Sequence, residues 1–301
     1  MFASLVFLAA GQQIVIPLGH PQQIEQPRAP LATYGPLFAS RCKDWDDYDK
    51  PAPPVRIFGN TYLVGTCGIS SILITDPAGD ILIDGGTEKD ADLIAANVRR
   101  LGFQLGDIKY LLNSHEHYDH VGGLAELQRM TGARLLASSA AAAVINSGTP
   151  SPDDPQAGML DSFPPARVDG IVSDGEQVRL GNSVVTATAT PGHTAGALTW
   201  HWGSCESGVC RQIVYADSLS TGGNDKYRFS DHRAYLAAYR ASIAKVAALH
   251  CDILLTPHPS ASDMVNRLGR AQLESGNACR EYAAGLTKQL DARLAKEAAK
   301  K

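Results

Sequence analysis

The sequence predicts an α/β protein in which two sheets pack face to face, with helices on their outer sides. Strand-like runs fall into two groups along the chain, and each group is accompanied by segments of helical spacing. Two such groups bury their apolar faces best against each other, with the helices as outer layers. The composition agrees, because 44% of the 301 residues are hydrophobic and 19% are charged, which is enough for a large core.

Charge and hydropathy exclude other classes of protein. The 27 basic and 31 acidic side chains leave a formal net charge of −4, which disfavours a protein that coats nucleic acid. No apolar run reaches the roughly 18–20 residues that a membrane-spanning helix needs. We therefore expect no nucleic-acid or membrane partner, and a monomer that acts on a small molecule.

The amino-terminal region differs from the rest. Residues 1–10 form an apolar stretch that ends in small residues and resembles the remnant of a secretory signal peptide, although it lacks the usual basic start. Residues 11–54 are rich in Gln and Pro and show no clear period, so we expect an extended arm. Residues 55–301 are expected to form a single domain.

The first group of elements starts after Pro54. Turn signals at Gly59-Asn60 and Asp76-Pro77 separate apolar, β-branched runs. The spacing of Leu93, Ile94 and Val98 places one apolar face on a helix. The predicted strands cover 56–64, 68–75, 80–84 and 108–112, and the predicted helices cover 89–100 and 124–130.

The second group follows a loop over 149–165 that is rich in Pro, Asp and Gly. A loop of this length is more often functional than a plain connection. The predicted strands beyond it cover 183–190, 198–202, 212–216 and 252–256, and the predicted helices cover 235–249 and 271–300.

Polar residues gather where predicted strands end. The strand over 108–112 runs into a His-x-His-x-Asp-His cluster, and two further histidines follow later strands in Pro-Gly-His and Pro-His-Pro. Loops at strand ends commonly form sites. The cluster and the two later histidines comprise His115, His117, Asp119, His120, His193 and His258.

These side chains favour a metal site. Unpartnered polar groups packed so closely would cost several kcal/mol if buried, and a metal removes that cost. Imidazole and carboxylate are good zinc ligands, and a zinc ion with an open position takes three protein ligands. Six ligands therefore predict two zinc ions. A histidine-rich solvent loop is the alternative. The remaining histidines, His20, His201, His232 and His250, are expected to be structural or exposed.

The six cysteines are even in number and form no Cys-x-x-Cys motif. With a signal-like start, they predict three disulfides and export to an oxidising compartment, periplasmic or extracellular. Cys205 and Cys210 flank a short loop and are natural partners, while the other pairings stay open. Six reduced, buried thiols are the alternative.

The cluster resembles the metallo-β-lactamase superfamily from about Val55 to the C-terminus. Asp84-Gly-Gly86, Pro191-Gly-His-Thr194, the segment 215–220 and Leu255-Thr-Pro-His-Pro259 are most similar to class B, subclass 3 metallo-β-lactamases. Subclass 1 would have a Cys at Ser218, and subclass 2 would have an Asn at His115. The resemblance implies a four-layer αββα sandwich with two mixed sheets.

The resemblance also implies roles for individual residues. One zinc is held by His115, His117 and His193, and the other by Asp119, His120 and His258. The disulfides are Cys42–Cys67, Cys205–Cys210 and Cys251–Cys279. The implied reaction is hydrolysis of penicillins, cephalosporins and carbapenems by a metal-bound hydroxide, with Asp119 as the catalytic residue that orients it. Such an activity gives antibiotic resistance.

Further residues are candidates for contacts with substrate. Ser218 and Ser220 are two residues apart on a segment expected to be extended, so both hydroxyls can face one substrate carboxylate. Gln156 lies in the long loop, where relatives place a substrate-contacting Gln. Asp84 is expected to fix a loop. Asp217 either bridges the two metals, as in related thioesterases, or turns away and holds its loop.

Other functions remain as alternatives. A glyoxalase II-like thioesterase or a lactonase shares the motif and would have a bridging Asp217 and free thiols. A nuclease is disfavoured by the net charge. A non-catalytic zinc protein would close the metal's ligand shell, whereas six ligands for two metals leave positions open.

Overall fold

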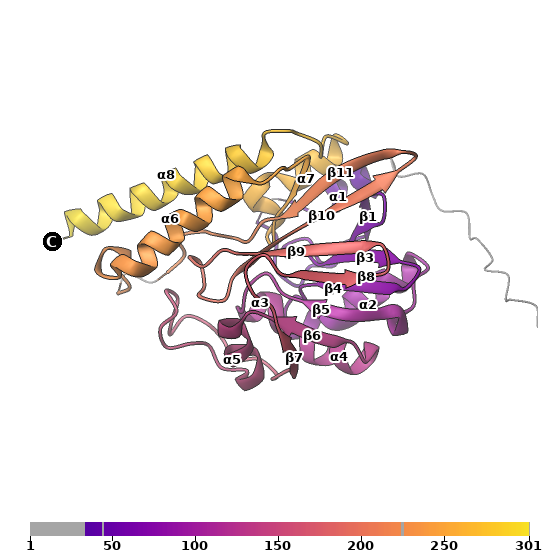
Figure 1. The fold of residues 1–301 in the computed structure, drawn as a ribbon, viewed down its shortest axis with the longest axis horizontal. Coiled ribbons are helices and arrows are strands. Elements are labelled where there is room, and N and C mark those ends of the chain that lie inside the picture. The colour runs from indigo at the N-terminus through magenta and orange to yellow at the C-terminus, as the bar shows by residue number, and fades with distance from the viewer. Residues whose placement is uncertain (1–33, 44, 224–225, 301) are drawn as a thin grey trace, which may run out of the picture.

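The computed structural model of the chain describes residues 34–43, 45–223 and 226–300. As predicted, it has two sheets packed face to face between helices (Figure 1). The first sheet has the strand order β1-β2-β3-β4-β5-β6-β7, with bounds Val55–Phe58, Thr61–Leu63, Ile72–Asp76, Gly79–Ile83, Ile108–Leu112, Arg134–Ala137 and Val168–Ile171. The second has the order β12-β11-β10-β9-β8, and its strands β8 to β12 span Gln177–Leu180, Ser183–Ala189, Leu198–Glu206, Val209–Tyr215 and Ile253–Leu255.

Both sheets are mixed, as expected. In the first sheet, β1 to β4 are antiparallel neighbours, and β5, β6 and β7 add in parallel to β4. In the second, β8 to β11 are antiparallel and β12 lies parallel to β11. Each sheet is therefore built from one continuous part of the chain.

The helices form the outer layers. Helices α2, α4 and α5 cover the first sheet, while α6 and α8 lie side by side over the second (Figure 1). Short α3 and α7 and the early α1 complete the set. The bounds of α1 to α8 are Tyr34–Arg41, Ala91–Arg100, Tyr118–Val121, Leu124–Thr131, Ser139–Ser147, Arg233–Ala248, Met264–Gly269 and Ala278–Ala299.

Alternation along the strands explains the layering. On β4, Ile81 and Ile83 join the core between the sheets, whereas Leu82 faces the helices of the first sheet. On β11, Tyr215 faces the core between the sheets and Val214 packs under α6 and α8. Side chains of a strand point to opposite faces in turn, so a sheet covered on both sides needs apolar residues at every position.

The structure differs from the sequence expectation near the amino end. Residues 34–41 form α1, where an extended arm was expected, because Phe38 is fully buried in the core between the sheets and fixes the segment there. The signal-like stretch 1–10 and residues 11–33, with His20, lie outside the described residues.

Other element boundaries also shift. The strand expected over 56–64 is two strands, because the turn at Gly59, with φ of +53°, reverses the chain. The strand expected from Gly68 begins at Ile72, because Ser70 donates a backbone hydrogen bond to Pro257 instead. Helix α8 starts at Ala278 rather than at Ala271, after the bend at Gly276-Asn277.

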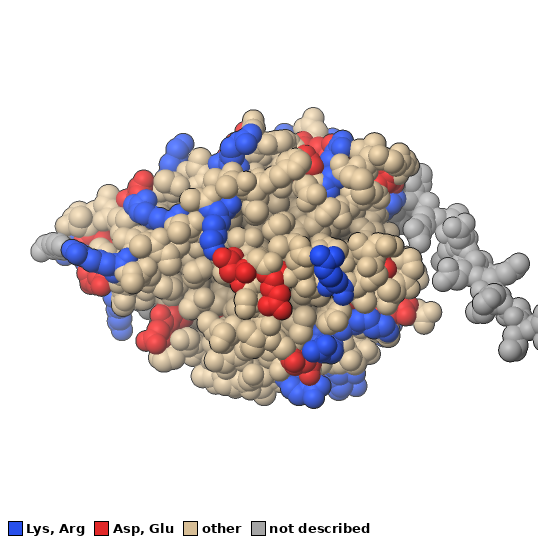
Figure 2. Space-filling model, in the orientation of Figure 1, with Lys and Arg blue, Asp and Glu red and all other residues tan. Residues whose placement is uncertain are grey.

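The predicted disulfides are confirmed. Cys42–Cys67, Cys205–Cys210 and Cys251–Cys279 are all bonded, and no free cysteine is left among the described residues. None of the helices in the described part of the chain is both long and apolar enough to cross a membrane. Figure 2 shows basic and acidic side chains interspersed on the face in view.

Candidate metal centre

The end of β5 is fixed to both sheets just before the histidine cluster. Ser114 donates its backbone N–H to Asp84 Oδ1 at 2.6 Å, and its carbonyl accepts from the N–H of Leu198 at 2.7 Å. The indole of Trp200 donates to the carbonyl of Asn113 at 2.8 Å. The cluster therefore begins from a rigid point at the junction of the two sheets.

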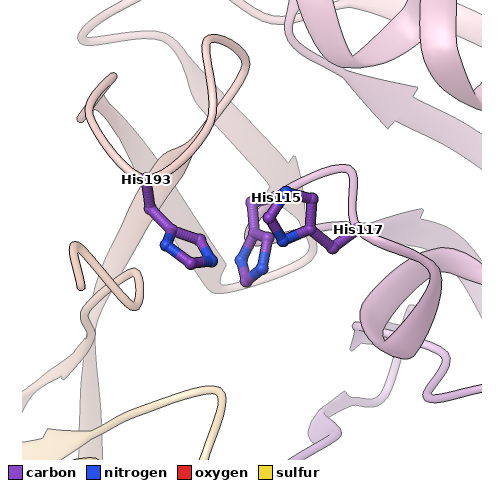
Figure 3. Close-up of side chains that lie close together, drawn as sticks. All are labelled: His115, His117 and His193. Atoms are coloured by element: carbon purple, nitrogen blue, oxygen red, sulfur yellow. The ribbon is translucent and has the colours of Figure 1, made fainter. Parts of the chain in front are cut away.

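Three histidines from two loops converge to form the first group. His115 and His117 follow β5, and His193 lies in the loop between β9 and β10. Figure 3 shows the three rings directed toward one another. Each ring offers a nitrogen, and these three atoms lie within 4.8 Å of one another.

The opposite nitrogen of each ring is held from behind. His115 Nδ1 lies 2.9 Å from Asp217 Oδ1, and His193 Nδ1 lies 3.1 Å from the carbonyl of Ser220. His117 Nε2 lies 3.1 Å from Asp154 Oδ2. An imidazole that donates its N–H on one side presents a lone pair on the other, so the inward nitrogens suit a metal.

Asp119, His120 and His258 form the second group. Asp119 Oδ2 lies 3.2 Å from His120 Nε2 and 3.5 Å from His258 Nε2, and the two Nε2 atoms are 3.3 Å apart. Of the two outer nitrogens, that of His258 has a hydrogen-bond partner, whereas that of His120 is buried without one. His258 Nδ1 lies 3.3 Å from the carbonyl of Gly68, and His120 Nδ1 lies 3.5 Å from Asp84 Oδ2. The ring of Tyr48 packs against His258, with centroids 5.4 Å apart.

Burial and charge set the protonation of these groups. Burial, together with the neighbouring imidazoles, lowers the pKa of His115 and His193 well below the ordinary value. Burial alone would raise the pKa of Asp119, but the charges of His120 and His258 outweigh it and lower that pKa. Neutral imidazoles and an ionised carboxylate are the forms that bind metals.

The pKa values of His120 and His258 shift in opposite directions, although the two rings are neighbours. Burial and the charge of His120 lower the pKa of His258 to about 4. For His120, burial is outweighed by Asp119 and Asp84, and its pKa rises to about 10. In the absence of a metal, His120 thus carries the proton of the pair.

The residues present fit metal ions. All six donors lie in two compact groups, and His115 Nε2 is buried with no hydrogen-bond partner. Leaving such an atom unsatisfied costs roughly 1–3 kcal/mol, and coordination removes that cost. The structure therefore brings the six predicted residues close together in space.

Asp84 and Asp217 lie behind the donors. Asp84 accepts from the hydroxyls of Ser114 and Tyr215, each at 2.7 Å, which is the loop-fixing position expected for it. Asp217 is fully buried beside His115 Nδ1, and its other oxygen accepts from the N–H of Leu219 at 3.2 Å. This arrangement matches the alternative in which Asp217 holds its loop.

Two carboxylates of the centre were missed by sequence reasoning. Glu116, between the first two histidines, accepts from the Thr194 hydroxyl at 2.7 Å and from the Gly196 N–H at 2.8 Å, and so ties the cluster to the loop of His193. Asp154 supports His117. The position of Asp154 in the long loop, two residues before Gln156, was the only sequence signal for it.

The candidate substrate contacts also lie at the centre, but not as expected. Residues 216–223 form no strand, and Leu219 has a φ of +41°, so the period-two argument for Ser218 and Ser220 was wrong. Ser218 Oγ is buried without a hydrogen-bond partner, whereas Ser220 Oγ lies 3.1 Å from His193 Nδ1. Gln156 Nε2 lies 3.4 Å from His193 Nε2.

The other described histidines lie elsewhere, as expected. His201 is half-buried on β10, and burial lowers its pKa. His232 stacks on Tyr227 at the start of α6, and His250 is exposed beside Asp252.

Comparison with known proteins finds one family. The chain matches the family model of the metallo-beta-lactamase superfamily over residues 64–258. The structure of the MIM-2 metallo-beta-lactamase is 55% identical with a TM-score of 0.85, over 88% of this chain and 98% of that chain. MEM-A1, a subclass B3 metallo-beta-lactamase isolated from a soil metagenome library, is 46% identical with a TM-score of 0.81, over 85% of this chain and 100% of that chain.

Curated relatives are more distant. A hydroxyacylglutathione hydrolase of Acidiphilium cryptum is 27% identical over 150 residues, which is 50% of this chain and 49% of that protein. The chain thus spans about half the length of this curated relative.

Proposed function

Because the chain belongs to the metallo-beta-lactamase superfamily, we propose that it hydrolyses the amide bond of penicillins, cephalosporins and carbapenems and so confers antibiotic resistance. The observation that carries the proposal is the pair of three-donor groups in a chain that is 55% identical, over 88% of its length, to a metallo-beta-lactamase. The fold positions these donors, and the identity to named lactamases selects the substrate class.

We assign two zinc ions to the centre. His115, His117 and His193 would hold one, and Asp119, His120 and His258 the other. When bound, such a metal pair activates a water as nucleophile near neutral pH and polarises the carbonyl under attack. Three protein ligands per zinc leave positions for water and substrate.

The chain's own residues would orient the reaction. Asp119 is the one carboxylate among the six donors, and it can orient the attacking water by accepting a hydrogen bond from it. Asp154 accepts a hydrogen bond from the outer nitrogen of His117 and so fixes that ring. Asp217 and Asp84 place carboxylate groups beside the outer nitrogens of His115 and His120. No serine nucleophile is needed.

Binding of the substrate is assigned to the rim of the centre. β-Lactam antibiotics carry a carboxylate beside the scissile amide, and Ser218 and Ser220 are proposed to donate to it. Ser218 Oγ is buried and has no hydrogen-bond partner in the protein. Gln156, beside His193, is proposed to contact the substrate from the opposite loop.

The disulfides support a proposal for the compartment in which the protein works. Three disulfides indicate an oxidising compartment. We therefore propose a periplasmic or secreted enzyme. We also propose that it works as a monomer without nucleic-acid or membrane partners, and that residues 55–301 form one domain, against which α1 packs through Phe38.

The test is hydrolysis of a penicillin, a cephalosporin such as nitrocefin, and a carbapenem by the purified chain. Activity should disappear on chelation and return with zinc. Clavulanate should not inhibit, because no acyl-enzyme forms on a serine.

A glutathione thioester assayed in parallel distinguishes the alternative. Its hydrolysis by zinc-loaded protein that leaves all three β-lactam classes intact would replace the proposal with the thioesterase alternative; the curated relative is named a hydroxyacylglutathione hydrolase.

A further inference from the structure

We propose that Asp154 is a positioning residue of the first metal group, through which the loop over 149–165 controls how tightly that group binds its metal. The inference rests on the proposed function in placing a metal between His115, His117 and His193. It goes further by assigning metal affinity to a loop that contributes none of the six donors.

The contact between Asp154 and His117 is buried and specific. Asp154 Oδ2 lies 3.1 Å from His117 Nε2, and both side chains are 4% exposed. A carboxylate buried beside an imidazole nitrogen accepts a hydrogen bond from its N–H and fixes both the tautomer and the ring orientation. His117 Nδ1 is then the nitrogen that faces the rings of His115 and His193, whose centroids lie 4.9 and 4.8 Å away.

Asp154 is itself held in place by its own turn. Its Oδ1 accepts from the N–H of Gln156 at 2.7 Å, so each carboxylate oxygen has one partner. The backbone around it closes with bonds from Asp154 N–H to the Ser151 carbonyl at 3.2 Å and from Ala157 N–H to the Asp154 carbonyl at 2.9 Å. The carboxylate cannot leave His117 without opening this turn.

The same turn reaches the third donor. The side chain of Gln156 lies 3.4 Å from His193 Nε2. One short segment therefore touches two of the three histidines of the first group. A displacement of the loop, by substrate or by mutation, would change the orientation of His117.

Asp154→Asn tests the role with little change of shape. The neutral amide can satisfy Gln156 N–H or His117 Nε2–H through its one oxygen, but not both. Loss of such a partner typically weakens metal affinity by about 10–100-fold. Asp153→Asn is the matched control, since Asp153 is the neighbouring residue and its side chain is exposed.

The measurement is a zinc titration of metal-free protein against a chromophoric chelator, without any β-lactam. We expect the tighter-binding zinc to be weakened by about 10–100-fold in Asp154→Asn and by less than twofold in Asp153→Asn. Thermal unfolding of the metal-free proteins should give one cooperative transition in all three chains, with at most a small decrease of the midpoint in Asp154→Asn for the one unsatisfied N–H. In the cobalt-loaded protein, the paramagnetically shifted N–H resonance of His117 should exchange with water much faster in Asp154→Asn.

Equal zinc affinities in Asp154→Asn and Asp153→Asn would overturn the proposal. A weakened affinity that comes with a lower midpoint of the metal-free chain, and with unchanged N–H exchange, would also overturn it, because the role would then be structural only. Since no substrate is used, loss of the β-lactamase assignment would leave this result standing, and the reverse also holds.

Discussion

At the scale of single residues, the five histidines of the metal centre differ in the group that lies at their outer ring nitrogen. His115, His117 and His120 each have a carboxylate at the outer nitrogen, whereas His193 and His258 have a backbone carbonyl. A carboxylate partner makes an imidazole a more basic ligand than a carbonyl does. Only His117 is hydrogen-bonded to its carboxylate, so the first group has one histidine strengthened in this way, and the second group has the charge of Asp119.

The serines near His193 give a prediction about substrate binding. The double variant Ser218→Ala, Ser220→Ala should bind zinc normally, because the Ser220 carbonyl that holds His193 Nδ1 is kept. Hydrogen bonds to a charged group contribute roughly 1.5–3 kcal/mol each, so KM for a cephalosporin should rise about tenfold or more. If the contact is the same in the ground and transition states, kcat should change little.

Steady-state kinetics and metal analysis by mass spectrometry check this, with Ser173→Ala as an exposed control. An unchanged KM would remove the carboxylate role. Loss of zinc would place these hydroxyls in the metal site.

At the scale of elements, the start of α2 contains a buried acid. Asp90 is 1% exposed and accepts from the N–H of Thr87 at 2.8 Å, which caps the single helical turn Glu88–Asp90 before α2. Burial raises its pKa from 3.8 to about 6. The folded state thus holds a proton that the unfolded state releases, and stability from this group is lost as pH rises from about 4 through 6.

Asp90→Asn should keep the cap and remove this loss. The difference in free energy of unfolding between Asp90→Asn and the parent chain should therefore shift in favour of Asp90→Asn by about 1–2 kcal/mol between pH 4.5 and pH 7. Urea denaturation with chelator present measures the effect without a contribution from metal release. A pH-independent difference between the two chains would contradict the buried-acid account.

The disulfides should differ in how much each contributes to the free energy of unfolding. Cys251–Cys279 joins the start of β12 to α8 across 28 residues, whereas Cys205–Cys210 spans 5 residues of a hairpin whose strands are already paired. Longer closed loops restrict the unfolded chain more, so replacing the first pair by serines should cost about 3 kcal/mol and the second about 2 kcal/mol or less. Equilibrium denaturation of both double variants tests the order, which the reverse ranking would refute.

Elements with strong local patterns could be predicted, and elements held by their surroundings could not. The strand over 108–112 matches β5 at both ends, because its apolar run is bounded on each side by polar residues. Strand β7 has the sequence Val-Asp-Gly-Ile and is partly exposed throughout, so neither period nor propensity marks it. Four of the nine residues of helix α5 are alanine, and its apolar face is defined only by the sheet that it covers.

At the scale of the whole molecule, the metal centre joins the two sheets. Four donors follow β5 of the first sheet, and His193 and His258 follow strands of the second. Metal binding should therefore stabilise the folded chain as a unit. Zinc at about 1,000 times its dissociation constant adds about 4 kcal/mol, which raises Tm by roughly 10 °C.

Calorimetry with zinc and with chelator measures this shift. The shift should shrink in His117→Ala and stay unchanged in His201→Ala, whose ring lies on β10 away from the centre. Equal midpoints with and without metal would mean that the centre does not tie the sheets together.

The metal donors were easier to predict from the sequence than the residues that hold them in place. The donors sit in a compact motif and at two strand ends, so their residue types alone indicated a metal. Their partners come from distant segments: Asp154 is 37 residues from His117, and Tyr215 is 131 residues from Asp84. No local pattern shows such pairs, because only the packing of the two sheets brings them together. The same holds for Leu219, whose left-handed backbone separates the two serine hydroxyls.

The two sheets are drawn from successive halves of the chain, and the exposed turn at Gly175 between β7 and β8 is where one half passes into the other. Each disulfide closes within a single half. A chain cut at this turn would leave two fragments with no covalent tie, each carrying part of the ligand set. Under the proposed function, neither fragment would degrade an antibiotic alone. In a bacterium exposed to a β-lactam, the cell would then survive only if the two fragments reassembled. If each fragment were fused to another protein, cell growth would therefore report whether those two proteins bind each other.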